Sequence, residues 1–162
     1  MKTLRTICLT LTLLLGSVGT SWGADFNKGL AAAQSGDFAT ALGEWRPLAE
    51  QGNAYAQFNL GRMYRQGLGV PQDYKIALKW FTLAAEQGIA DAQTNLGVMY
   101  GTGQGVIQDN VYAHMWGNIA AEQGLEEAVK LRDLAAGQMT PADISTAQNL
   151  ARECVRKNYK GC

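Results

Sequence analysis

The same short motifs recur every 36 residues along the middle of the chain. Residues 49–64 and 85–100 share Ala-Glu-Gln-Gly, Ala-x-Ala-Gln, Asn-Leu-Gly and Met-Tyr in the same order, and Ala-Glu-Gln-Gly returns at residues 121–124. Asp37, Asp73 and Asp109 keep the same 36-residue spacing. A fixed period of roughly 20 to 50 residues is typical of stacked supersecondary units. The chain is therefore expected to be a repeat protein.

Helix start and stop signals divide each unit into two helices. Glycine-rich segments at residues 67–71 and 101–105 interrupt the apolar periodicity, and an aspartate suited to capping a helix follows each of them. Pro47 should bend or loosen the helix that contains it, and Gly52 is the expected left-handed residue after that helix. The expected helices cover residues 25–35, 38–50, 53–66, 73–87, 89–100, 109–123 and 125–136, followed by a last one from residue 140.

Two further features concern packing. Gly61 and Gly97 recur in mid-helix, where glycine costs about 1 kcal/mol against alanine, so both should mark close approach to a neighbouring helix. From residue 140 the repeat pattern stops and a strong helix start appears, with Thr140 as N-cap and Pro141 at the first helical position. Residues 140–162 should form a C-terminal cap whose apolar stripe comprises Ile144, Ala147, Ala151, Cys154 and Val155. We predict an all-α fold, a right-handed α/α solenoid of about three to four helix pairs with a C-terminal capping helix.

The N-terminus has the pattern of a secretory signal peptide. Lys2 and Arg5 precede a short apolar stretch, residues 7–15, and cleavage is expected after Gly23. Residues 24–162 would then form a single domain, divided into a first unit at 24–48, repeats at 49–84 and 85–120, and a partial repeat with cap at 121–162. A periplasmic or secreted location is expected. In such an oxidising compartment Cys154 and Cys162 should form a disulfide.

The charge of the chain excludes one class of partner. It holds 14 basic and 14 acidic residues, so nothing favours nucleic acid as a main partner. No second apolar run is long enough for a membrane span. The basic stretch at residues 152–160 has two interpretations, an anionic contact or a solvated helix end.

The motifs resemble those of the Sel-one-like repeat (SLR) family, a cousin of the tetratricopeptide repeat. The resemblance rests on the motifs above, the Gly-x-Gly-Val loop and the Ala-x-x-Trp at residues 77–80, and covers nearly all of residues 24–162. Residues 26–48 resemble a tetratricopeptide-like first unit, and residues 139–141 resemble the end of exported bacterial members. The resemblance implies a scaffold for protein interactions whose first helices line a concave surface. Cysteine-rich members described as binding or hydrolysing β-lactams carry cysteine pairs within each repeat, and this chain has none there.

The residues do not assemble a recognisable catalytic site. His114 occupies a position that is Leu78 and Leu42 in the other units, which favours a packing role. The glycines of residues 101–105 lack the strand and the Gly-Lys-Ser/Thr ending of a phosphate loop. Glu126 and Glu127 are a carboxylate pair at a helix start, where negative charge is favourable anyway. We expect no enzymatic activity, no cofactor and no metal.

Comparison of the two full repeats suggests a binding surface. Positions identical in both, among them Asn59/Asn95 and Gly61/Gly97, are interpreted as those needed for stacking. The positions that differ are spaced by three or four residues and form one helical stripe. The candidate partner-binding residues are Tyr55, Phe58, Arg62 and Arg65, with Asp91 and Thr94 as counterparts in the next repeat. The alternative is an ordinary solvent face.

Three functions remain open at this stage. The first is a non-enzymatic scaffold or adaptor in the cell envelope or outside the cell, which binds an unidentified protein or peptide on its concave face. The second is a hydrolase or binding protein directed at cell walls or β-lactams. The third is a purely structural assembly subunit. The sequence leaves the oligomeric state open, with a monomer among the options.

Overall fold

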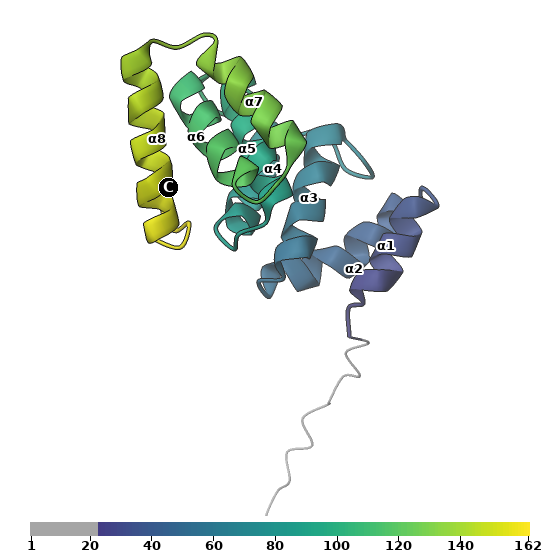
Figure 1. Cartoon of the computed structure of the whole chain (residues 1–162). Helices are drawn as coiled ribbons and strands as arrows, with labels where there is room; N and C mark the ends of the chain where they lie inside the picture. Colours follow the sequence, from purple (N-terminus) through teal and green to yellow (C-terminus); the bar gives the residue numbers. More distant parts are fainter. Residues whose placement is uncertain (1–22) are drawn as a thin grey trace, which may run out of the picture.

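The computed structural model describes residues 23–162, which form eight helices and, within that range, no strand (Figure 1). The expected signal segment therefore lies outside the described residues, apart from Gly23. The all-α prediction is confirmed, and α2 continues through Pro47 to its end. The helices are α1 (Phe26–Gln34), α2 (Phe38–Glu50), α3 (Ala54–Gln66), α4 (Tyr74–Ala85), α5 (Ala90–Thr102), α6 (Asn110–Ala121), α7 (Glu126–Ala136) and α8 (Pro141–Arg156).

Consecutive helices pack against each other and build an α/α solenoid. Figure 1 shows α1 and α2 at one end of the stack and α8 at the other. One apolar core lies between α2 and α3, around Trp45, Leu60 and Met63. A second is shared by α4, α5, α6 and α8, around Phe81, Leu96 and Met115. No helix within residues 23–162 is long and apolar enough to cross a membrane.

The predicted caps are present at the repeated positions. The carboxylates of Asp37, Asp73 and Asp109 accept hydrogen bonds from backbone N–H groups in the first turns of α2, α4 and α6. Gly52 has a φ of 95° and donates its N–H to the carbonyl of Ala49, while the next residue bonds back to Leu48. This pair of bonds is the Schellman ending that a left-handed glycine permits. The repeated aspartates and glycines therefore set the helix boundaries.

The mid-helix glycines make room for a side chain of a neighbouring helix, as predicted. A Cβ atom at Gly61 would lie 2.6 Å from the Phe81 ring, and one at Gly97 would lie 2.6 Å from Leu131. Gly29 in α1 has the same relation to Trp45, at 2.5 Å. Trp45 and Phe81 are 36 residues apart, whereas Gly29 and Gly61 are only 32 apart. The loop between α1 and α2 is therefore four residues shorter than the loop between α3 and α4.

Buried glutamines explain why Gln recurs in two of the motifs. Gln57 and Gln93 donate their side-chain N–H groups to the carbonyls of Ala49 and Ala85, at the end of the preceding helix. Their side-chain oxygens accept hydrogen bonds of 2.7 Å from Gln87 and Gln123, one unit further along the chain. Each pair thus ties one unit to the next while satisfying polar groups that burial would otherwise leave unpaired.

The C-terminal cap packs against α6. Ala147, Ala151 and Cys154 of α8 are buried, as predicted. Ile144 is only half-buried and Val155 is 38% exposed, so the predicted stripe is wrong at Val155, because Leu150 packs against the core in its place.

The segment after α8 folds back onto the turn between α4 and α5. Cys154 and Cys162 form a disulfide with their Cα atoms 5.5 Å apart. The backbone N–H of Gly161 donates to the carboxylate of Glu86 over 3.1 Å, and the ring of Tyr159 lies against Gly88. The disulfide therefore holds the end of the chain against a turn about 70 residues earlier.

Candidate binding surface

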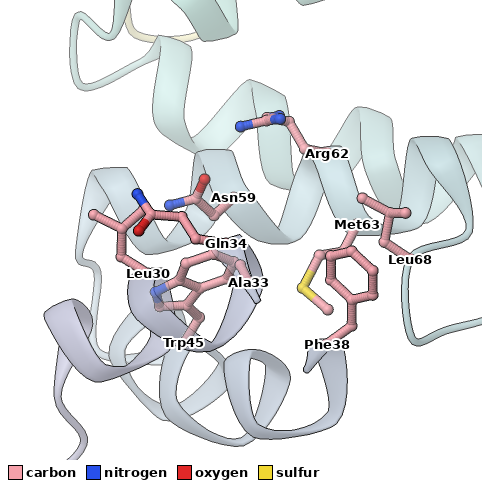
Figure 2. Close-up of a pocket in the computed structure, with 9 residues that line it drawn as sticks. All are labelled: Leu30, Ala33, Gln34, Phe38, Trp45, Asn59, Arg62, Met63 and Leu68. Carbon is pink, nitrogen blue, oxygen red and sulfur yellow. The ribbon is translucent and has the colours of Figure 1, made fainter. Parts of the chain in front are cut away.

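A cavity of about 390 Å³ opens between α1 and α3, over α2 (Figure 2). Its size lies near the lower end of the range for ligand pockets, roughly 300–1,000 Å³. Three helices and the loop after α3 contribute to its walls. The lining residues are Leu30, Ala33, Gln34, Phe38, Trp45, Asn59, Arg62, Met63 and Leu68.

The floor of the cavity is apolar and fixed in position. Trp45 and Met63 are only 4% and 2% exposed and belong to the first core. The indole N–H of Trp45 donates to the carbonyl of Phe26 over 3.2 Å, and its ring lies 6.0 Å from the Phe26 ring. A ring held by both a hydrogen bond and packing provides a preformed surface for an apolar group.

Two polar side chains of α3 complete the cavity. Figure 2 shows the amide of Asn59 close to Gln34 and Trp45, and the guanidinium of Arg62 further from Trp45 on the same helix. Asn59 is 9% exposed, yet its side-chain amide has no hydrogen bond to any residue of the described chain. Arg62 is exposed, stands 5.9 Å above the ring of Phe58, and takes part in no ion pair among residues 23–162. Both groups are available to a ligand.

The next unit shows why this space is empty. In α5, the amide oxygen of Asn95, the counterpart of Asn59, accepts a hydrogen bond from Arg65 of α3. Gly29 of α1 and Gly61 of α3 occupy equivalent positions, each against an aromatic ring of the next helix. Four residues further on, α1 has Ala33 where α3 has Arg65. The methyl group of Ala33 is too short to reach Asn59. The cavity therefore follows from one small side chain at a position that an arginine fills in the next unit.

The structure divides the six residues of the predicted stripe into different environments. Tyr55 is 61% exposed, with its ring 6.3 Å from that of Phe26. Phe58 is half-buried with its ring 5.9 Å from that of Phe81, so it packs against the second core. Asp91 is exposed, and the hydroxyl of Thr94 donates to the carbonyl of Ala90. Of the six, Arg62 alone lines the cavity.

Sequence reasoning missed the other members of the cavity. Asn59 was interpreted as a stacking residue because both repeats carry it, and Leu30, Gln34 and Trp45 belong to the atypical first unit. A signal was present in the sequence, since aligning Gly29 with Gly61 pairs Ala33 with Arg65. These residues are 32 positions apart because the first loop is four residues shorter, so a comparison at the 36-residue period does not pair them.

The other candidate positions are accounted for by packing. His114 is 3% exposed within α6, and its Nδ1 atom has no hydrogen-bond partner among residues 23–162. Burial lowers the pKa of His114, and the nearby Arg132 lowers it further while Asp133 opposes both. Gly105 has a φ of 74° and lies against the backbone of Tyr74, which makes its loop a close-packed turn. Glu126 and Glu127 are exposed in the first turn of α7.

Over residues 23–162, no three His, Cys, Asp or Glu side chains are grouped so that they could hold a metal ion.

Comparisons with known proteins agree with this architecture. The profile of the Sel1 repeat family matches residues 54–89 and 90–125, two consecutive segments of 36 residues each. A protective antigen present in uropathogenic Escherichia coli strains, which displays an SLR fold, has 29% identity and a TM-score of 0.77 over 82% of this chain and 30% of its own. A Sel1 repeat protein from Oxalobacter formigenes has 34% identity and a TM-score of 0.64 over 67% of this chain and 44% of its own. The chain thus spans less than half the length of either protein. No curated protein is significantly similar to the chain.

Proposed function

Because this chain is a Sel1-like repeat protein, we propose that it is a non-enzymatic scaffold that binds a protein or peptide partner on the concave side of its first helices. The proposal places the contact on the α1–α3 cavity and on the neighbouring stripe of α3 and α5. That stripe runs over Tyr55, Phe58, Arg62 and Arg65 to Asp91 and Thr94.

One observation carries the proposal. The Asn59 amide lies in a preformed cavity beside Arg62, and neither side chain makes a hydrogen bond or an ion pair within residues 23–162. A ligand in the cavity can therefore bind both groups without breaking a hydrogen bond of the described chain. Tryptophan and arginine are also enriched among the residues that dominate binding energies, and both line this cavity.

The proposed location is the cell envelope or the extracellular space. The disulfide between Cys154 and Cys162 supports it, because disulfides persist in oxidising compartments. The intact mass of exported protein should begin near Ala24 and be two hydrogens lighter than the dithiol form. Free thiols on exported material would contradict this part of the proposal.

The binding proposal is tested by site-specific photo-crosslinking in the native host. A photoreactive amino acid replaces Gln34, which is exposed and lines the cavity, or Lys79, which is exposed on α4 and serves as the control. We expect one discrete adduct from position 34 and none from position 79. Adding Ala33→Arg should abolish the adduct, because it restores the arginine that fills the corresponding space at Asn95. An adduct that persists with Ala33→Arg, or that forms equally at position 79, would contradict the proposal.

A further inference from the structure

The chemistry of the cavity also indicates what kind of partner segment it accepts, an inference that rests on the function proposed above. We infer that the α1–α3 cavity binds a linear peptide segment that places a large apolar side chain on the Trp45–Met63 floor and an aspartate or glutamate carboxylate against Arg62 and Asn59.

The charge of the bound group follows from the lining. Arg62 is the one charged residue among the nine that line the cavity, and none of them is acidic. No carboxylate within residues 23–162 forms an ion pair with Arg62. Arg65, one turn further along α3, bonds to the neutral amide of Asn95 and so leaves its own positive charge uncompensated. A guanidinium binds a carboxylate through charge-assisted hydrogen bonds, and the Asn59 amide adds N–H donors.

The apolar half of the segment follows from the floor and walls. Trp45 and Met63 lie at the bottom, with Leu30, Phe38 and Leu68 around them. A side chain the size of leucine or phenylalanine placed there would lose contact with water on several sides, which stabilises the complex. A volume of about 390 Å³ suits one or two residues rather than a folded element.

The geometry of α3 favours the interior of a chain over its terminus. Tyr55 and Arg65 of α3 come before Asn59 and after Arg62 in the sequence, ten positions apart, which is about 15 Å of helix at a rise of 1.5 Å per residue. An extended chain covers that length with about five residues at roughly 3.3 Å each. A segment that follows α3 over this length passes Arg62 in its interior, where the carboxylate belongs to a side chain.

The inference is tested with displayed peptides. Random decapeptides fused to a phage coat protein through their C-termini present no free C-terminus, and they are selected on immobilised protein comprising residues 24–162. Selection on wild type should enrich aspartate or glutamate within one or two positions of a large apolar residue. The Arg62→Glu variant should lose the acidic preference and gain a basic one, because the exposed position reverses the charge at the rim without disturbing the core. The Arg156→Glu variant, altered at an exposed arginine of α8, should keep the wild-type preference.

The enriched peptide is then titrated as a free, acetylated and amidated molecule. Its affinity should fall at least about tenfold with Arg62→Glu and should be lost with Ala33→Arg. No enrichment, or the same acidic enrichment with Arg62→Glu, would overturn the inference. Binding that requires a free C-terminal carboxylate would also overturn the inference, because the cavity would then bind the terminus of a chain and not an acidic side chain. A position-34 adduct in the host without any acidic preference in selection would leave the proposed scaffold function standing and remove this inference alone.

Discussion

Glycine inside a helix has opposite effects on stability at two positions of this chain. A Cβ atom at Gly61 would come within 2.6 Å of the Phe81 ring. A Cβ atom at Gly43 in α2 would have nothing within 4 Å among residues 23–162 apart from its chain neighbours and the backbone of its own helical turn. Helix propensity alone favours alanine at both positions by about 1 kcal/mol. The difference between them therefore isolates the packing role of the repeated glycine.

Gly61→Ala should destabilise the protein by about 1–3 kcal/mol, because the added methyl group overpacks the contact between α3 and α4. The matched control, Gly43→Ala, should stabilise it by about 0.5–1 kcal/mol. Urea denaturation followed by circular dichroism measures both changes. If Gly61→Ala stabilises the protein as much as Gly43→Ala does, the close approach of α3 and α4 is refuted.

His114 should make the stability depend on pH. Burial and Arg132 lower its pKa below the usual value of about 6.5, so the unfolded chain binds more protons than the folded one just below that value. Stability is therefore greatest above pH 6.5 and decreases as the pH falls from there toward the lowered folded pKa. His114→Leu, which introduces the residue found at Leu78, should remove this decrease.

The melting temperatures of wild type and His114→Leu at pH 7.5 and pH 5.5 test this expectation. The wild type should lose more on acidification than the variant does. The carboxylates with lowered pKa values do not interfere, because their own effects on stability lie below about pH 4.5; they are Asp37, Glu44, Asp143 and Glu153. Equal losses in both proteins would show that His114 is not the responsible group.

At the scale of the helix, α8 is a structural part of the stack rather than a tail. Ala151 is 2% exposed, whereas Gln148, three residues earlier on the same helix, is exposed. Ala151→Asp would bury a charge without a partner and should cost at least about 3 kcal/mol. Gln148→Asp adds the same side chain on the solvent side and should cost less than about 1 kcal/mol.

Chemical denaturation of these two α8 variants gives the comparison. Each unit of a solenoid is stabilised by its interfaces with the neighbouring units. Ala151→Asp should therefore shift the whole unfolding transition and not only a part of it. An unfolding midpoint for Ala151→Asp equal to that of Gln148→Asp would indicate that α8 contributes little to the fold.

The helices could be predicted from the sequence because their signals are local. Asp73 caps α4 within its own first turn, and Gly52 ends α2 through its own φ. The cavity could not be predicted in the same way, because it depends on contacts between units. Asn59 and Asn95 are identical, but their environments differ because Ala33 and Arg65 approach them from the preceding helix. A comparison of the two repeat sequences identifies the residues they share, but it does not show which residue of the preceding helix contacts each of them.

At the scale of the whole molecule, the two ends of the solenoid differ. The C-terminal end is closed by α8 and by the disulfide-held segment that returns to Glu86. The other end has the cavity between α1 and α3, lined by Asn59 and Arg62, which make no hydrogen bond or ion pair within residues 23–162. The contact proposed above therefore lies at the end of the described stack opposite to α8.

Amide hydrogen exchange, measured by mass spectrometry on the protein alone and with the partner captured at position 34, tests this account most directly. The account predicts slower exchange in the partner complex for α1 and α3, together with the loop after α3, and unchanged exchange in α6 and α8. Slowed exchange confined to α8, to the disulfide-held segment or to the loop at residues 101–105 would contradict it.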